Sequence, residues 1–227
     1  MIDVKRLGHV GVSVPDVERA AAFYEQIVGM EISDRVDGSV FLRCSDEHHC
    51  LGLYPGTERG LHHLGLDVGD GDALEHVRSV LDREGLEPVP DEDHHPGIGE
   101  SICYLDPDGN RLKFYEGMQQ IEQPLAPRAV GPVKFGHITF HTIDLNRTLP
   151  FYRDLLAFRL SDTVAGNALA WLRCSPDHHG VAFLNDGRAK VNHYCFDLPN
   201  WPAIKAICDH LKENEVPIIY GPSRHGP

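Results

Sequence analysis

The sequence repeats itself, and this duplication restricts the possible folds more than any other feature. RLGHVGVSVPDVERAAAFYEQIVGMEISD (residues 6–34) aligns without gaps with KFGHITFHTIDLNRTLPFYRDLLAFRLSD (residues 134–162), so that His9 pairs with His137. After a two-residue insertion, FLRCSDEHH aligns with WLRCSPDHH. Separated matches in one order are not produced by chance, and we expect two copies of one structural unit.

Each copy contains a finer pattern of one strand, one helix and three strands. In the first copy it occurs twice, with helices expected at 15–29 and 71–85, and strands at 8–14, 30–36, 39–45, 49–56, 62–68, 87–91, 101–106 and 111–117. The second copy has one complete module and the opening of another, with a strand at 192–198, a helix at 201–215 and a strand at 216–222. The pattern predicts an α+β fold of tandem βαβββ modules.

The duplication also predicts two domains. We expect an N-terminal domain over residues 1–116 and a C-terminal domain over 134–227, since residues 117–133 are rich in Pro, Gly and Gln and are typical of a linker.

Charge and cysteine content exclude several classes of partner. The formal net charge is −13, which argues against nucleic acid or an anionic membrane as a ligand. The sequence has no apolar run long enough to cross a bilayer, and the start lacks the features of a signal peptide. The six cysteines show no CxxC spacing. We therefore expect a reduced, cytoplasmic protein.

Histidines stand at matching places in the strands that open the modules. A single strand histidine is usually a core or surface residue held by a local hydrogen bond. His9 and His63 in the first copy, and His137 and His193 in the second, are pairs. If the modules pack with pseudo-symmetry, each pair points into one cup, and two neutral imidazoles on rigid strands form half of a metal site.

Several separated motifs resemble one family. LGHVGVSVPDVERAAAFYEQIVGMEISD, FLRC..DHH, the HH or NH strand, LDPDGN and GPSRHGP occur in order between about residue 6 and residue 227. They resemble the type I extradiol ring-cleavage dioxygenases of the vicinal oxygen chelate superfamily. This resemblance implies a metal-free N-terminal domain and a C-terminal Fe(II) site, with Mn(II) as the occasional alternative. It also implies cleavage of a catechol-type substrate with O2, and assembly into a homo-oligomer.

The resemblance assigns roles to individual residues. It makes His137 and His193 metal ligands and His178 the acid and base of the pocket. His225 corresponds to a histidine that takes part in catalysis and hydrogen-bonds the substrate, and Trp171 to an aromatic wall of the substrate pocket.

Strand alternation and the third ligand add two expectations. We expect His179, the neighbour of His178, to point to the opposite face of its strand.

The family's third ligand is a glutamate on the last strand, where the first copy has Lys113, and an ammonium group cannot ligate while charged. In the second copy this place projects to about position 243, beyond Pro227, so we expect the 227 residues to be part of a longer polypeptide.

Two alternative functions stay open. One is a metal-dependent lyase or isomerase of the glyoxalase kind, and the other is a non-catalytic protein that binds a small molecule. Only a dioxygenase would consume O2 in the presence of a catechol.

Overall fold

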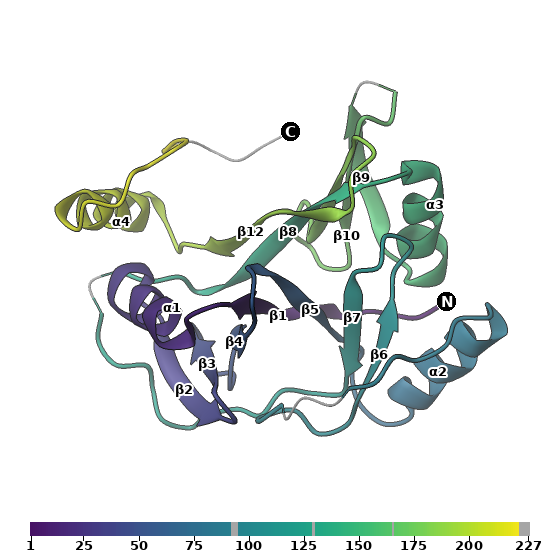
Figure 1. Ribbon diagram of the computed structural model, residues 1–227, viewed down its shortest axis with the longest axis horizontal. Helices are drawn as coiled ribbons and strands as arrows, with labels where there is room; N and C mark the ends of the chain where they lie inside the picture. The colour runs from purple at the N-terminus through teal and green to yellow at the C-terminus, as the bar shows by residue number, and fades with distance from the viewer. Residues whose placement is uncertain (92–94, 129, 165, 223–227) are drawn as a thin grey trace.

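The strands form two mixed sheets, one for each copy of the repeat (Figure 1). The computed structural model describes residues 1–91, 95–128, 130–164 and 166–222. The first sheet has the strand order β2-β3-β4-β1-β5-β7-β6 and the second β12-β8-β11-β10-β9. The strands of the first sheet are β1 (Arg6–Val14), β2 (Glu31–Val36), β3 (Ser39–Arg43), β4 (Leu51–Pro55), β5 (Gly60–Asp67), β6 (Ser101–Leu105) and β7 (Arg111–Tyr115). Those of the second are β8 (Lys134–Thr142), β9 (Arg159–Val164), β10 (Leu169–Arg173), β11 (Val181–Asn185) and β12 (Lys190–Asp197).

The two sheets repeat the same pairing around their central strands. β1 is parallel to β4 and antiparallel to β5, while β8 is parallel to β11 and antiparallel to β12. The histidine pairs therefore lie on adjacent antiparallel strands in each half, which brings the side chains of each pair together on one face of a sheet. The predicted α+β fold of βαβββ modules is confirmed.

The helices begin and end where the sequence supplies caps. They are α1 (Val17–Phe23), α2 (Ala73–Arg83), α3 (Leu145–Pro150) and α4 (Trp201–Glu213). The Asp16 and Asp144 side chains accept backbone N–H groups in the first turns of α1 and α3. Each of these two helices then continues as a π-helical turn, over Tyr24–Val28 and Phe151–Leu155. Gly29 ends the first turn with a φ of 81°, a left-handed conformation that favours glycine.

Two predicted strands are wrong. Residues 87–91 form no strand, and only Val89 bridges to Cys103. Residues 216–222 form no strand either, and Ile219 there is 96% exposed. Both segments contain prolines, which have no N–H to donate to a sheet.

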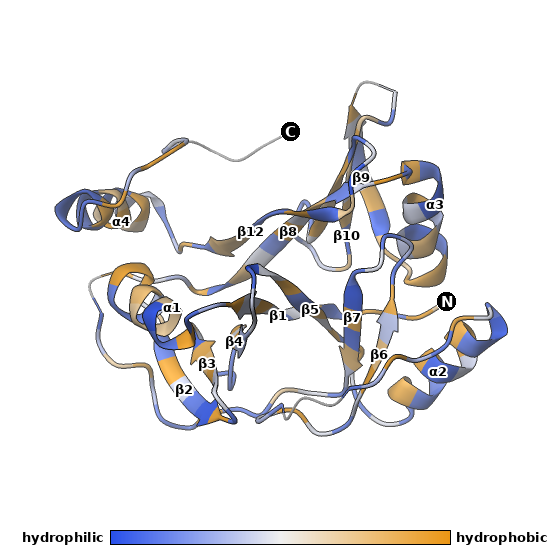
Figure 2. Ribbon diagram, in the orientation of Figure 1, coloured by the Kyte–Doolittle hydropathy of each residue, from blue (hydrophilic) through white to orange (hydrophobic). Residues whose placement is uncertain are grey.

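The halves share one hydrophobic core. Buried apolar side chains of both sheets and of α1, α2 and α3 form a single cluster, and Figure 2 shows hydrophobic residues recurring along the strands. In contrast, α4 stands to the side of the second sheet and has no buried residue (Figure 1). Within the described ranges, the helices are all too short or too polar to cross a membrane.

Candidate metal centre

His137 of β8 and His193 of β12 converge on one point in the second half. Their Nε2 atoms are 3.1 Å apart, with the rings nearly perpendicular. The Thr139 hydroxyl lies 3.3 Å from the same nitrogen of His193. Neutral imidazole is a common metal ligand, and two Nε2 atoms directed at one point can bind the same ion. The structure thus brings together the two predicted ligands.

A chain of polar side chains orients His193. Its Nδ1 donates to the Asn192 amide oxygen at 2.7 Å, and the Asn192 amide nitrogen donates to His141 Nε2 at 2.9 Å. His141 Nδ1 in turn donates to Asp186 at 2.7 Å. With its proton on Nδ1, His193 has a lone pair on Nε2 that is available to a metal. Hydrogen bonds to the other ring nitrogen commonly fix the tautomer of metal-binding histidines in this way. Sequence reasoning missed this chain, because it connects β8, β12 and the turn between β11 and β12.

His179, not His178, lies against His137. The His179 ring centroid is 4.4 Å from that of His137 and the residue is buried, whereas His178 is exposed. The expectation that His179 points away is wrong. β10 ends at Arg173 and β11 begins at Val181, so both histidines lie in a loop, where strand alternation does not apply.

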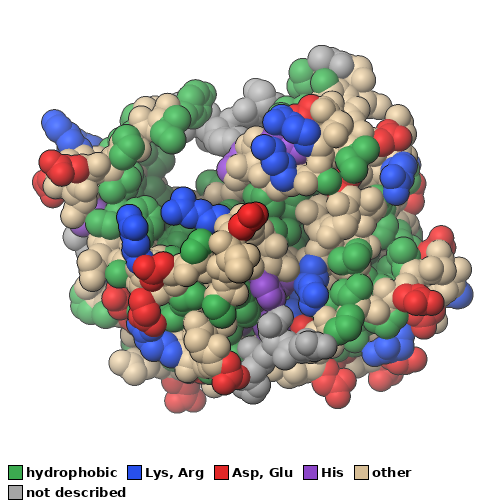
Figure 3. Space-filling model, viewed as in Figure 1, with side chains coloured by type: hydrophobic (Ala, Val, Ile, Leu, Met, Phe, Trp, Pro, Cys, Tyr) green, Lys and Arg blue, Asp and Glu red, His purple; other side chains and the backbone are tan. Residues whose placement is uncertain are grey.

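A cavity of about 530 Å³ opens beside these histidines. Its apolar wall is formed by Phe196 of β12 and by Trp201 and Ile204 of α4. Figure 3 shows the surface hollowed beside the α4 arm. The sequence analysis did not predict this wall, because no local sequence pattern shows that α4 faces β8 across a cavity. The complete lining is Gly136, His137, Asp177, His178, His179, Cys195, Phe196, Asp197, Leu198, Asn200, Trp201 and Ile204.

Trp171, a predicted site residue that the structure describes, does not join this lining. Trp171 is 5% exposed on β10, pairs with Ala182 of β11 and is not among the residues around the cavity. His225 lies outside the described residues.

The carboxylates next to His137 are held by a lysine. Lys134 contacts Asp177 at 2.7 Å and Asp197 at 3.4 Å. Burial alone would raise the pKa of Asp177, but the hydrogen bond and charge of Lys134 outweigh it and lower that pKa. Across the described residues, no group of three or more His, Cys, Asp or Glu side chains is arranged to hold a metal ion. The described residues therefore bring together two of the predicted ligands, His137 and His193, without a carboxylate beside them that completes a metal site.

The first half contains a matching but closed cluster. His9 Nε2 and His63 Nε2 are 2.9 Å apart. The His49 ring centroid is 4.7 Å from that of His9, which matches the position of His179 beside His137 in the second half. All three side chains are 0% exposed. The pKa values of His9, His49 and His63 lie well below the usual histidine value. Burial is the main cause, and the charges of neighbouring histidines and of Lys113 add to it.

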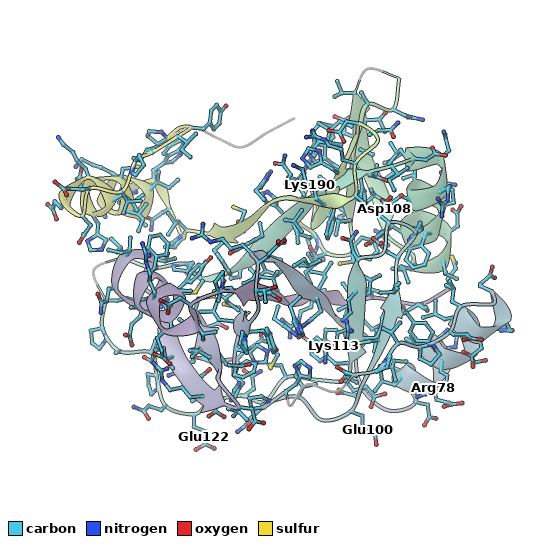
Figure 4. All side chains as sticks on the ribbon, in the orientation of Figure 1. Arg78, Glu100, Asp108, Lys113, Glu122 and Lys190 are labelled. Atoms are coloured by element: carbon cyan, nitrogen blue, oxygen red, sulfur yellow. The ribbon has the colours of Figure 1, made fainter. Side chains whose placement is uncertain are left out.

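Lys113, which the resemblance puts at the place of the family's carboxylate ligand, is buried in the first half. It is 0% exposed on β7, and Figure 4 places it on the inner side of that strand. Its ammonium group is ion-paired with Asp91, which also contacts His95 Nε2 at 3.3 Å and accepts from Ser101 at 2.7 Å. Burial would raise the pKa of Asp91, but these three partners lower it well below its usual range. A fixed cation here opposes metal binding.

Comparisons with known proteins show which sequences this chain is similar to. The sequence model of the Glyoxalase/Bleomycin resistance protein/Dioxygenase superfamily matches residues 6–114 and 134–227. Metapyrocatechase of Geobacillus stearothermophilus is 28% identical, over 100% of this chain and 75% of its own length. The iron-dependent extradiol dioxygenase of Rhodococcus jostii strain RHA1 is 27% identical, over 99% of this chain and 82% of that protein.

Solved structures show the same fold. The 2,3-dioxygenase LapB of Pseudomonas sp. KL28 superposes with a TM-score of 0.87 at 25% identity, covering 100% of this chain and 86% of that one. The Mn(II)-bound glyoxalase of Novosphingobium aromaticivorans superposes with a TM-score of 0.88 at 25% identity, over 98% of this chain and 75% of that chain. The duplicated modules, the paired histidines and these matches together show that the chain belongs to the Glyoxalase/Bleomycin resistance protein/Dioxygenase superfamily.

Proposed function

We propose that the chain acts as an extradiol dioxygenase, which cleaves the ring of a catechol-type substrate beside its hydroxyl groups with O2. The observation that carries this is the convergence of His137 and His193 Nε2 beside a cavity with an apolar wall. Relatives named as metapyrocatechase and extradiol dioxygenase over nearly the whole chain support the same reaction.

His137 and His193 would hold Fe(II), or Mn(II) as the alternative, because neutral imidazole suits both metals. Relatives named as iron-dependent and as manganese-dependent enzymes support both choices. When bound, the metal supplies adjacent coordination positions at which a catecholate and O2 can meet. Asn192 keeps the proton of His193 on Nδ1, so that Nε2 remains available as a ligand.

His179 is the better candidate for the acid and base. It is buried beside His137 on the cavity wall, within the space that a metal-bound catechol would fill. A neutral imidazole there can accept the proton of a catechol hydroxyl and return it later in the reaction. The exposed His178 lies at the rim of the cavity, where it contacts His179 through Nδ1 at 3.1 Å.

The apolar wall fits an aromatic ring. Phe196, Trp201 and Ile204 can contact the face of the substrate and exclude water from it. The polar histidines on the other wall then receive the two hydroxyl groups, which orients the ring for cleavage.

Oxygen uptake tests the proposal. Protein loaded with Fe(II) under anaerobic conditions is mixed with catechol in aerated buffer, and O2 consumption and the visible absorbance of the ring-opened product are followed. Equal uptake of O2 and formation of product supports the proposal. Catechol bound but recovered unchanged would identify a binding protein, while conversion of an α-keto-aldehyde–thiol adduct without O2 uptake would identify an isomerase of the glyoxalase kind.

Domain limits and assembly complete the proposal. The domains are residues 1–116 and 134–227, and the protein is a cytoplasmic homo-oligomer that binds neither nucleic acid nor membrane. The confinement of each sheet to one copy supports the two domains. Sedimentation of the purified protein measures the assembly state.

A further inference from the structure

Two cysteines of the first half lie in contact at the ends of one short loop. The Sγ atoms of Cys44 and Cys50 are 3.0 Å apart, and both residues are 3% exposed. Both are free thiols. The sulfur atoms of a disulfide are about 2.05 Å apart, so a small movement of these two side chains would allow a bond to form between them.

The backbone holds the two ends of this loop in register. Cys44 directly follows β3 and Cys50 directly precedes β4. The Cys50 N–H donates to the Leu42 carbonyl of β3 at 2.9 Å, and the Cys50 carbonyl accepts from the Val10 N–H of β1 at 3.1 Å. Hydrogen bonds to two neighbouring strands therefore fix Cys50 opposite the end of β3, where Cys44 lies.

The second half does not repeat this pair. FLRCSDEHHC (residues 41–50) aligns with WLRCSPDHHG (residues 171–180), so the equivalent of Cys44 is Cys174 and the equivalent of Cys50 is Gly180. A Cβ atom on Gly180 would lie 2.7 Å from Cδ1 of Leu7, whose side chain occupies that place. The thiol pair is thus a property of the first half, and Cys174 provides a control within the same chain.

A small oxidant can reach Cys50. This residue lines a cavity of about 210 Å³ between the halves, with Glu47 on one side and Asp177 on the other. The hydrogen bond with Cys44 first, and burial second, raise the pKa of Cys50 well above the ordinary thiol value. Since the thiolate is the reactive form, Cys50 should react slowly and only with excess oxidant.

We propose that Cys44 and Cys50 are an oxidation site, which hydrogen peroxide converts into a disulfide that locks the loop of residues 45–49. The Cys50 sulfur attacks one peroxide oxygen, the O–O bond breaks, and a sulfenic acid and one water molecule are formed. The Cys44 sulfur then attacks the Cys50 sulfur, and the sulfenic oxygen leaves as a second water molecule with the proton of Cys44. Each thiol gives up one electron and one proton, and the peroxide takes up both pairs.

The loop that the disulfide would close holds the start of the segment between the two copies. The His48 N–H donates to the Gln119 carbonyl at 2.8 Å, and the Ile121 N–H donates to the Asp46 carbonyl at 2.7 Å. We expect the disulfide to stabilise this region, because a closed loop lowers the entropy of the unfolded chain. No predicted metal ligand takes part, so the inference goes beyond the proposed function and does not depend on it.

Mass spectrometry of the full chain tests the chemistry. The reduced protein is treated with hydrogen peroxide, unfolded in urea with N-ethylmaleimide and digested with trypsin. Cleavage after Arg43 and Arg59 puts both cysteines on one peptide, residues 44–59. We expect this peptide to lose two hydrogen atoms and to carry no label after oxidation, and to be labelled on both cysteines after reduction with dithiothreitol.

Cys174 is the control in the same digest. Burial raises its pKa to about 12, and it should carry the label before and after peroxide. Label on both Cys44 and Cys50 after peroxide would overturn the inference. Sulfinic acid on either residue in place of the disulfide would overturn it as well, because the neighbouring thiol would then have failed to react.

Unfolding in urea tests whether the bond locks the loop. The oxidised wild type should unfold at a higher urea concentration than the reduced protein, with its unfolding equilibrium constant lowered by about tenfold or more. Peroxide should not raise the urea midpoint of Cys50→Ser, whereas Cys174→Ser should behave as the wild type does. An equal or lower midpoint for the oxidised wild type, or an equal rise in Cys50→Ser, would overturn the inference.

Discussion

The two halves hold the same pair of histidines on the same pair of strands, but they use them differently. In the first half, His9 and His63 are sealed from solvent and face the ion pair of Lys113 with Asp91. In the second half, the Nε2 atoms of His137 and His193 are 3.1 Å apart, and His137 lines a cavity of about 530 Å³. The comparison shows that a histidine pair alone does not make a site. In the first half, the buried ion pair of Lys113 with Asp91 beside the histidines opposes metal binding, and the pair forms part of the core.

Loss of metal is the largest effect that we expect. His137→Ala removes one of two ligands and should abolish metal binding and turnover, whereas His9→Ala should retain the full metal content. Metal analysis of the folded variants after dialysis gives the measurement. Equal metal loss in both variants would show that the first half also binds metal, and the contrast between the halves would fail.

Proton transfer is the next effect. His179→Ala should retain metal but lower turnover by about 10²–10⁴-fold, because a general acid and base contributes about that much. His178→Ala should stay within about threefold of wild type, since its side chain is exposed at the rim. The measurement is the O2 uptake rate at saturating catechol. A larger loss in His178→Ala would restore His178 to the role predicted from the sequence.

Breaking the buried ion pair should destabilise the fold. Lys113→Met leaves Asp91 without its ammonium partner and should lower the free energy of unfolding by about 3–5 kcal/mol. The control is Lys134→Met in the second half, where the lysine side chain is 45% exposed, and its cost should be below about 1 kcal/mol. Urea unfolding measures both. Lys113→Met combined with Asp91→Asn should recover much of the loss.

The orientation of His193 can be tested separately from its presence. Asn192→Ala removes the acceptor of the His193 Nδ1 proton and should weaken metal affinity by about 10–100-fold. His62→Ala, the equivalent change in the first half, should not alter metal affinity. Competition with a chelator provides the dissociation constants. Unchanged affinity in Asn192→Ala would mean that packing alone orients the ligand.

The smallest effect is the share of a single histidine in the pH dependence of stability. His9, His49 and His63 have lowered pKa values in the folded state, so the unfolded chain binds more protons below the ordinary value of 6.5. Stability is therefore complete above about pH 6.5 and falls as the pH drops, by up to about 1.4 kcal/mol per pH unit for each histidine. Urea unfolding between pH 7.5 and 5.5 measures the slope. His49→Gln should reduce the slope of unfolding free energy against pH by the contribution of one histidine. An unchanged slope would contradict the explanation that burial lowers the pKa of His49.

The sequence by itself determined the duplication, the βαβββ order and the identity of the paired histidines. These features follow from local periodicity and from alignment of the two copies, because a strand position determines which face of the sheet a side chain occupies. The resemblance to the extradiol dioxygenases, and not the alignment of the copies, identified Lys113 as the residue that stands where the family has a ligand. The sequence pattern predicted strands wrongly at residues 87–91 and 216–222, where segments that contain proline form no strand.

Only the tertiary structure decided what surrounds those residues. The alternation rule placed His179 on the wrong side, because a loop and not a strand carries it. The chain from His193 through Asn192 and His141 to Asp186 joins segments by packing, which no local pattern records. The partner of Lys113 is likewise a residue from a segment without regular structure. Side-chain identity and strand register are local properties, while cavities, ion pairs and tautomers depend on contacts between residues far apart in the chain.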